Sequence, residues 1–273
     1  MKRLSWFNIT SLTLGFAFLY IPMIILIIYS FNAGKLVTVW SGFSTKWYGT
    51  LFQNEAFMDA AWVTIKVAVI SSTFATILGT MAAYVLVRGG RFLGRTLFSG
   101  MIFAPLVMPE VITGLSLLLL FIGIGLDRGV LTIVLAHTTF SMCYVSVVVS
   151  SRLVSFDRSL EEAALDLGSS PWDAFRLVTL PMIAPAVIAG WLLAFTLSLD
   201  DLVIASFVSG PSSTTLPIKI FSAVRLGVSP EINALSTIMI AIVTVGVISA
   251  SLVSKRNSLR AQKDAQAAER TAE

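Results

Sequence analysis

Two adjacent acidic residues, Asp200 and Asp201, stand in the stretch LSLDDLVIASF, whose other side chains are apolar or carry a single hydroxyl. A carboxylate at the centre of a membrane-spanning helix costs about 2.5–3.5 kcal/mol on insertion scales, so each one needs a compensating partner. On a helix, Asp201 shares a face with Ser198 and Trp191. A carboxylate, a hydroxyl and an indole ring can together stabilise a cation, by charge and through the ring face. These residues therefore predict a pathway for a positively charged solute.

A third acidic residue, Glu110, stands in the apolar stretch APLVMPEVITG. Pro105 and Pro109 lack backbone donors and predict a broken helix, which is tolerated at membrane depth only beside protein or a water-filled cavity. The predicted spans contain one lysine, Lys66, and no arginine. A lysine near the end of a span can extend its amine to the membrane surface instead of pairing with an acid. We therefore expect the missing positive charge to come from the substrate.

A structural role is the alternative for the two aspartates. They can accept hydrogen bonds from neighbouring groups or pair with an arginine of a partner subunit, and so stabilise the helix bundle. His137 and Cys143 are the only histidine and the only cysteine in the sequence. Neither an intrachain disulfide nor an ordinary multi-ligand metal site can form from one of each, so both are expected to pack inside the bundle.

The composition indicates what holds these residues. Hydrophobic residues make up 56% of the 273-residue chain and charged residues 12%, against about 25% charged in an average soluble domain. Because about 20 apolar residues span a bilayer as a helix, the sequence predicts an all-α integral membrane protein with one transmembrane domain over residues 1–273. The six predicted spans are residues 12–31, 61–87, 97–124, 130–150, 186–207 and 234–254. No small-residue cleavage site follows the first span, which is therefore expected to be retained.

Positive residues collect on the cytoplasmic side of membrane proteins and so indicate orientation. If both termini are cytoplasmic, thirteen Lys and Arg residues fall in cytoplasmic segments and five in outer loops. Both termini are therefore predicted to be cytoplasmic. The basic tail, residues 255–273, is expected to face anionic lipid or to solvate the end of the last helix. No nucleic-acid partner is needed to explain the basic charge.

The longest predicted cytoplasmic segment, residues 151–184, has the sequence signals of two short helices. Ser159 and Glu162 have the spacing of a capping box, in which each side chain accepts from a free backbone donor. An apolar face follows at Leu160, Ala163, Ala164 and Leu167. Gly168 is suited to the left-handed conformation that ends a helix.

The second short helix is predicted to begin at Ser170 and Pro171, as N-cap and first helical residue. Pro181 and Pro185 are expected to end it and to start the fifth span. The pair of helices would form a compact docking surface on the cytoplasmic face.

The spacing of this segment resembles the coupling-loop signature of the permease subunits of type I ABC importers. The pattern is Glu-Ala-Ala, three residues, Gly, nine residues, a branched aliphatic residue, one residue and Leu-Pro. Here it is formed by Glu162, Ala163, Ala164, Gly168, Val178, Leu180 and Pro181, with valine where the family usually has isoleucine. The resemblance implies the six-helix type I importer permease fold, with a cytoplasmic helix-turn-helix that docks in a cleft of an ATPase subunit.

Residues 197–236 resemble in detail the permeases of bacterial polyamine importers, above all those of putrescine and spermidine systems. Polyamines are multiply charged cations, which agrees with the acidic pair. The resemblance implies that uptake depends on Ser198, Asp200, Asp201, Glu110, Trp47 and Glu162. An interfacial position in the aromatic belt is the alternative for Trp47.

The resemblance also implies the partners. They are a second homologous permease, two ATP-binding cassette ATPase subunits, a periplasmic polyamine-binding protein and the bilayer of a bacterial inner membrane. The sequence contains no G-x-x-x-x-G-K-[ST] loop, so ATP and Mg are expected on the ATPase subunits, and this chain is not expected to be an enzyme.

Two other functions are compatible with the intramembrane acids. One is an importer permease for another cationic or neutral solute. The other is a proton-coupled secondary transporter in which Asp200, Asp201 and Glu110 relay protons. A secondary transporter has no need of the coupling-loop spacing, which favours an ABC importer.

Overall fold

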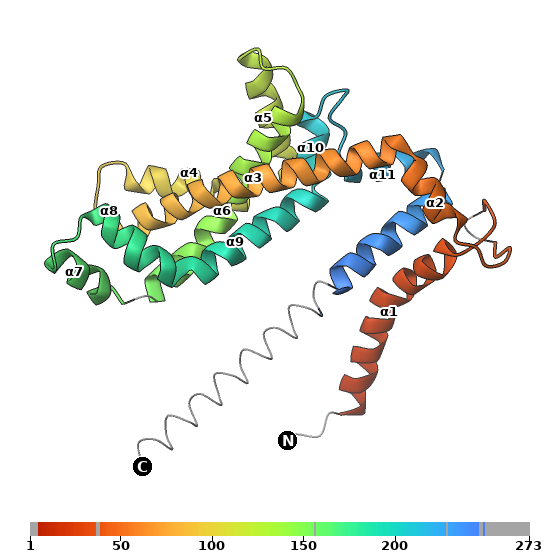
Figure 1. The fold of residues 1–273 in the computed structure, drawn as a ribbon, viewed down its shortest axis with the longest axis horizontal. Coiled ribbons are helices and arrows are strands. Elements are labelled where there is room, and N and C mark those ends of the chain that lie inside the picture. The colour runs from red at the N-terminus through yellow and green to blue at the C-terminus, as the bar shows by residue number, and fades with distance from the viewer. Residues whose placement is uncertain (1–4, 37–38, 156, 228, 246–247, 249–273) are drawn as a thin grey trace. The chain divides into compact units, whose positions relative to one another are not determined.

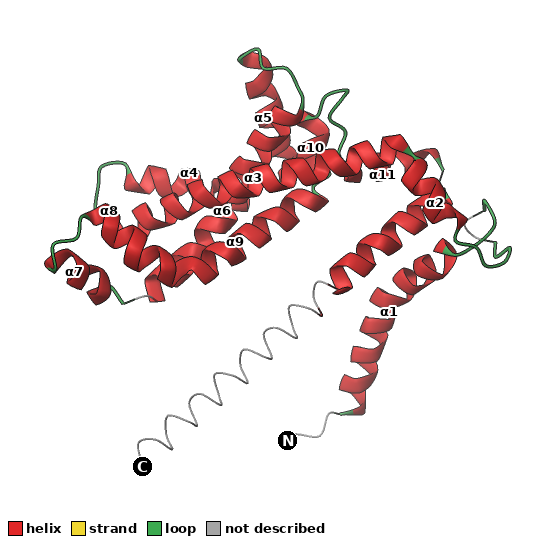
Figure 2. Cartoon of the chain, in the orientation of Figure 1, coloured by secondary structure: helices red, strands yellow, loops and turns green. Residues whose placement is uncertain are grey.

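The computed structural model describes residues 5–36, 39–155, 157–227, 229–245 and 248 of the chain. Within these ranges the secondary structure is helical, apart from loops and an isolated antiparallel bridge between Asn32 and Phe43 (Figure 2). The predicted all-α class is therefore confirmed. The chain divides into two compact units, residues 1–54 with 223–273 and residues 55–222, and each is described by itself.

The first unit contains α1 (Trp6–Ser30), α2 (Lys46–Gln53) and the helix Pro230–Val245. The most apolar stretch of α1 has a mean hydropathy of 2.3, and none of it is buried in the chain. Such a helix is stable only against lipid or another apolar surface. The last predicted span, 234–254, overlaps the helix Pro230–Val245. Residues 246–247 and 249–254 of that span, and the tail 255–273, lie outside the described residues.

The second unit is built on three long helices, α3 (Glu55–Arg88), α6 (Val130–Ser155) and α9 (Leu180–Asp200), which pack along one another (Figure 1). Small residues allow this close approach, as in other membrane helix bundles. A Cβ added at Gly79 of α3 would lie 2.6 Å from the carbonyl oxygen of Met142 in α6. The shared core includes Ala75, Val145 and Ala194, each fully buried.

The predicted third span, 97–124, is not one straight helix. It consists of α4 (Arg95–Val107) and α5 (Glu110–Gly123), which are bent by 118° at the break. Pro109, which cannot donate a backbone hydrogen bond, stands at this break, as its sequence position predicted. Pro105 lies inside α4 and does not interrupt it.

The predicted end of the second cytoplasmic helix at Pro181 and Pro185 is wrong. Helical structure runs without interruption from Pro171 to Asp200, through α8 (Pro171–Ala174), the π-helical turn η1 (Phe175–Thr179) and α9. At the end of η1, the amide of Leu180, the residue directly before Pro181, donates to the Phe175 carbonyl five residues earlier. A π-turn changes the hydrogen-bond register locally, so a missing proline donor need not end the helix.

The predicted fifth span, 186–207, is also corrected at its C-terminal end. α9 ends at Asp200, Asp201 is extended, and the short helix α10 (Val203–Val208) follows and packs against α5 and α6. α11 (Leu216–Leu226) follows α10 in the chain. The acidic pair therefore lies at a break between two helices and not within one.

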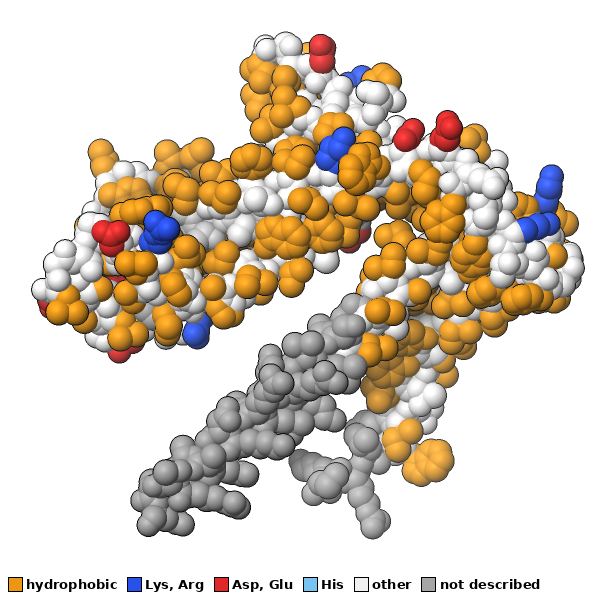
Figure 3. Space-filling model, in the orientation of Figure 1, with side chains coloured by type: hydrophobic (Ala, Val, Ile, Leu, Met, Phe, Trp, Pro, Cys, Tyr) orange, Lys and Arg blue, Asp and Glu red, His pale blue; other side chains and the backbone are white. Residues whose placement is uncertain are grey.

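Apolar side chains cover much of the visible surface of the long helices (Figure 3). In α3, for example, Phe74 is 53% exposed and Ile77 is 51% exposed. By length and apolar composition, four described helices can cross a membrane, and the bent pair α4 and α5 can supply a fifth crossing.

Candidate functional site

The break between α9 and α10 gives the two aspartates different environments. Asp201 has φ −64° and ψ 120°, so its side chain turns back over the start of α10. Its Oδ1 accepts from the Ile204 amide at 3.2 Å, and its Oδ2 accepts from the Ala205 amide at 2.7 Å. A carboxylate that receives the first free amides of a helix stabilises the start of that helix. Asp201 therefore caps α10.

The Asp201 carboxylate also contacts the only histidine of the sequence. Nε2 of His137 lies 3.0 Å from Asp201 Oδ2, and Nδ1 lies 2.6 Å from Ser198 Oγ. The Ser198 hydroxyl in turn accepts from Ser71 at 3.1 Å. The imidazole is 2% exposed, so its polar atoms depend on these partners. His137 was expected to pack in the bundle; it is buried there and also joins α3, α6, α9 and α10 in one polar network.

This network bears on the two roles considered for Asp201. Its side chain is only 10% exposed, and the His137 ring and two backbone amides satisfy the carboxylate without any substrate. Burial of a carboxylate is compensated when hydrogen bonds of this kind are present. The geometry thus supports a structural role for Asp201 and Ser198. Their part in a substrate pathway stays a prediction.

Asp200, by contrast, is exposed at the last position of α9. Within the described part of the chain it forms no ion pair. Its carboxylate is therefore the member of the acidic pair that remains available to a cation. The helix end that carries it is fixed by the neighbouring Asp201.

The other two predicted pathway residues of the second unit lie at defined places. Glu110 is exposed at the first position of α5, directly after the break at Pro109, where a negative charge suits the helix N-terminus. Trp191 donates from Nε1 to Thr73 Oγ1 at 3.2 Å and stacks on Phe195 with ring centroids 5.2 Å apart. Both stay predictions as substrate contacts.

Trp47 belongs to the first unit, where it anchors the loop after α1. The residue is 9% exposed, and Nε1 of its ring donates to the carbonyl oxygen of Asn32 at 2.8 Å. The Asn32 side chain bonds the backbone of the same loop at Leu36, Val39 and Ser41. A ring enclosed in this way differs from the exposed ring expected in an aromatic belt. Its effect on uptake stays a prediction.

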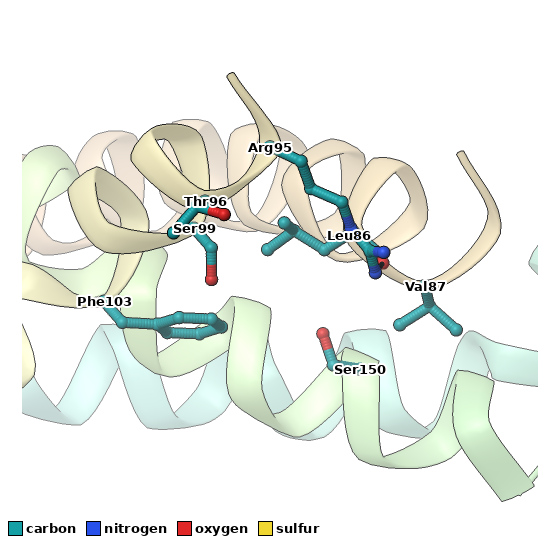
Figure 4. Close-up of a pocket in the computed structure, with 7 residues that line it drawn as sticks. All are labelled: Leu86, Val87, Arg95, Thr96, Ser99, Phe103 and Ser150. Atoms are coloured by element: carbon teal, nitrogen blue, oxygen red, sulfur yellow. Dashed lines mark hydrogen bonds between the residues drawn. The ribbon is translucent and has the colours of Figure 1, made fainter. Parts of the chain in front are cut away.

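A cavity of about 450 Å³ lies among α3, α4 and α6 of the second unit (Figure 4). Its lining residues are Leu86, Val87, Arg95, Thr96, Ser99, Phe103 and Ser150. The Arg95 guanidinium donates to the Leu86 carbonyl at 2.7 Å. The lining contains a basic side chain and no acidic one, so it does not suit a cation and includes none of the predicted pathway residues.

In the coupling segment, the predicted cytoplasmic residues 151–184, α6 continues to Ser155 and the first short helix is α7 (Ser159–Asp166). The predicted capping box is absent from α7. Asp157, and not Glu162, accepts from the Ser159 amide, at 2.9 Å. Hydrogen bonds from the backbone and the side chain of Ser159 lower the pKa of Asp157. Glu162 pairs instead with Arg158 at 3.0 Å on the exposed surface, where its side chain is 59% exposed. Glu162 is thus accessible to a partner.

The end of α7 and the start of α8 follow the sequence signals. Gly168 has φ +88°, and the Ser169 amide donates to the Ala164 carbonyl at 3.1 Å, as at a glycine-terminated helix end. Ser170 then caps α8 by accepting from the Asp173 amide at 3.1 Å, with Pro171 in the first turn. Hydrogen bonds at both helix ends therefore define the turn between α7 and α8.

The remaining residues of the predicted coupling signature fall on both sides of this turn. Ala163 is exposed and Ala164 half-buried on α7, beside Glu162. Leu180 packs against the core of α3, α6 and α9, while Pro181 is exposed in the first turn of α9. The signature thus runs from an exposed helix into the bundle.

The sequence reasoning missed Glu161. It is the buried residue of α7, and its carboxylate contacts Arg88 at the end of α3 and Thr179 of η1. Its partners lie far away in the sequence, and the periodicity of α7 marks only the apolar face. No signal in the coupling segment alone could have identified it.

Comparison with known proteins identifies this architecture. The family described as "Binding-protein-dependent transport system inner membrane component" matches residues 75–262. The chain belongs to this permease family. The match agrees with the prediction of a membrane permease that is not itself an enzyme.

Two relatives from Escherichia coli (strain K12) align over most of the chain. The putrescine transport system permease protein PotI is 58% identical over 265 residues, with 94% of each chain covered. The spermidine/putrescine transport system permease protein PotC is 46% identical over 244 residues, covering 89% of this chain and 92% of PotC. The predicted resemblance to polyamine importer permeases is confirmed.

Solved permeases share the fold. A bacterial ABC transporter involved in the import of alginate matches with a TM-score of 0.70 at 19% identity, over 93% of this chain and 99% of the other. The MetNI methionine ABC transporter matches with a TM-score of 0.59 at 15% identity, over 71% of this chain and 92% of the other. At these identities the likeness concerns the fold alone, and it confirms the predicted importer permease architecture.

Proposed function

We propose that this permease is a subunit of an ATP-driven importer that moves putrescine, and with it other polyamines, into the cytoplasm. The observation that carries the proposal is the 58% identity to a putrescine permease over 94% of the chain. The relative that matches at 46% identity is named for spermidine as well as putrescine. A polyamine is a flexible cation, and the exposed carboxylate of Asp200 at the end of α9 carries the negative charge that would attract it.

The proposed assembly contains a second homologous permease, two ATPase subunits that bind ATP and Mg, and a periplasmic polyamine-binding protein. The exposed apolar surfaces of α1 and α3 support contacts with lipid and with another permease. The exposed α7, with Glu162 accessible, supports docking of an ATPase subunit. With α7 on the cytoplasmic side, both chain termini are cytoplasmic in the six-span arrangement.

In the proposed mechanism, Asp200 replaces part of the water that the cation loses on entering the membrane. The network of Asp201, His137 and Ser198 holds the α9 end and the start of α10, so that the neighbouring carboxylate keeps its position. Glu110 at the start of α5 adds a second negative charge to the pathway. ATP binding and hydrolysis in the partner subunits drive the change between outward and inward states.

The test is ATP-dependent uptake of radiolabelled putrescine into proteoliposomes that contain the whole assembly. Loss of a hydrogen bond to a charged group, worth about 1.5–3 kcal/mol, predicts that Asp200→Asn lowers uptake about 10- to 150-fold at limiting putrescine. Asp127→Asn, which removes an acid from an exposed loop, is the control. ATPase activity and subunit assembly are followed in parallel.

Each result has a definite meaning. Assembled Asp200→Asn complexes that hydrolyse ATP but import little putrescine support the pathway. Normal uptake by this variant contradicts the role of Asp200. Absence of ATP-dependent uptake by the wild-type assembly contradicts the proposed substrate.

A further inference from the structure

The helix α7 buries a carboxylate where an amphipathic helix normally buries apolar side chains. Glu161 is 7% exposed, whereas Leu160 and Leu165 of the same helix are 47% and 43% exposed. Leu167, which directly follows the helix, is 89% exposed. The helix is therefore attached to its own chain through an acidic group, and its two leucines face outward.

Both oxygens of the Glu161 carboxylate have partners on other elements. Oε2 lies 3.0 Å from Nε of Arg88, and Oε1 accepts from the Thr179 hydroxyl at 2.8 Å. The side chains of Arg88 and Glu161 are 12% and 10% exposed, and Thr179 is fully buried. A buried ion pair offsets its loss of hydration only when its remaining atoms are hydrogen-bonded, as they are on this carboxylate.

Glu161, Arg88 and Thr179 connect α7 to α3 and to the start of α9, two of the long helices of the bundle. Arg88 is the last residue of α3, which packs on both α6 and α9. Thr179 ends the π-helical turn η1 and directly precedes α9. One turn before Arg88, the Tyr84 ring packs edge to face on Phe175 of η1, with centroids 4.9 Å apart. π-Helical turns occur frequently at functional sites, and this one lies where α7, α3 and α9 meet.

We propose that Glu161, Arg88 and Thr179 form a buried strut that transmits displacement of α7 to α3 and α9. The inference rests on the proposed function, in which an ATPase subunit moves α7. Glu161 is a positioning residue in this scheme, because it acts through Arg88 and Thr179. Its neighbour Glu162 faces outward with Arg158 and belongs to the docking surface. Glu162 thus contacts the ATPase subunit, and the adjacent Glu161 transmits the movement to α9, the helix that ends at Asp200.

The experiment uses the complete complex in proteoliposomes and measures the ratio of putrescine imported to ATP hydrolysed. Thr179→Val removes the hydroxyl while keeping the side-chain shape, and Thr179→Ser keeps the hydroxyl. Glu161→Gln removes the charge of the carboxylate, and the double variant Arg88→Glu/Glu161→Arg reverses the pair. Thr139→Val is the matched control, because Thr139 bonds only the Leu135 carbonyl of its own helix in the described structure.

We expect Thr179→Val and Glu161→Gln to assemble and, in the absence of the binding protein, to hydrolyse ATP near the wild-type rate. Their import per ATP should fall about 5- to 150-fold, the range usual for coupling between linked sites. Thr179→Ser and Thr139→Val should retain the wild-type ratio, and the double variant should recover part of the loss caused by Glu161→Arg alone. Rescue by the conservative or reversed variant separates a coupling role from simple loss of packing.

The strut is refuted if Thr179→Val and Glu161→Gln keep the wild-type ratio. The strut is equally refuted if import, ATP hydrolysis and assembly fall together in Thr179→Val and Glu161→Gln, and fall as far in Thr179→Ser and in the reversed pair. A wild-type complex that imports no putrescine contradicts the proposed substrate and leaves a separate readout for the strut. In that case stimulation of ATP hydrolysis by the binding protein must be lost in Thr179→Val and kept in Thr179→Ser.

Discussion

Nε2 of His137 lies 3.0 Å from Oδ2 of Asp201, and this contact fixes the place where α9 ends and α10 begins. The same carboxylate accepts from the amides of Ile204 and Ala205. A helix break at membrane depth exposes backbone groups that water cannot reach, so protein groups must satisfy them. The histidine holds the carboxylate that does this. His137 and Asp201 thus together stabilise the break between α9 and α10, which lies beside Asp200.

Replacement of His137 tests this relationship. His137→Ala removes one hydrogen-bond partner from each of Asp201 and Ser198, and loss of a hydrogen bond to a charged group costs about 1.5–3 kcal/mol. We expect a correspondingly lower free energy of unfolding for the purified permease in detergent. Denaturant titration followed by tryptophan fluorescence measures it.

Thr139→Val, two residues along α6, is the control and should change stability little. The double variant His137→Ala/Asp201→Asn should lose less than the sum of the two single changes, because the two residues share one network. Additive losses would show that the His137 contact to Asp201 is energetically unimportant.

The elements that could be predicted from sequence are those with local signals. Gly168 ends α7 and Ser170 with Pro171 starts α8, since caps and turns depend on residues a few positions apart. Pro109 marks the break between α4 and α5 for the same reason. The polar partners inside the bundle could not be predicted in this way. His137 and Asp201, or Arg88 and Glu161, meet only after distant helices have packed.

The prolines of the coupling segment show how packing overrides a local signal. Pro181 and Pro185 were expected to end a helix, yet helical structure continues through both. The register change in η1 accommodates Pro181, and the start of α9 packs through Leu180 and Ile183 against the core of the second unit. Sequence alone indicates that a proline disturbs a helix, but not whether a π-turn and tertiary contacts absorb the disturbance.

The close contact between α3 and α6 leads to a prediction at Gly79. A Cβ at this position would lie 2.6 Å from the Met142 carbonyl and 2.8 Å from the Val145 Cβ. Because both neighbours are fixed by their helix, Gly79→Ala must push the two helices apart. We expect a loss of stability of about 1–3 kcal/mol, the usual cost of overpacking a core.

Gly100→Ala in α4 provides the matched control, because no atom lies within 4 Å of the added Cβ. Alanine is about 1 kcal/mol more favourable than glycine inside a helix, so this variant should keep or gain stability. Thermal unfolding of both variants in the same detergent makes the comparison. If Gly79→Ala were as stable as Gly100→Ala, the close packing of α3 on α6 would be contradicted.

The start of α7 is predicted to depend on pH through Asp157. Hydrogen bonds from Ser159 lower the pKa of this carboxyl in the folded protein. The ionised carboxylate therefore stabilises the helix start above its ordinary pKa, and this contribution is lost as the pH falls through the lowered value. Amide hydrogen exchange at the start of α7, corrected for the intrinsic effect of pH, should show weaker protection on acidification. Asp157→Asn should remove most of that pH dependence, whereas Asp166→Asn at the other end of α7 should retain it. An unchanged response in Asp157→Asn would show that another group controls the helix start.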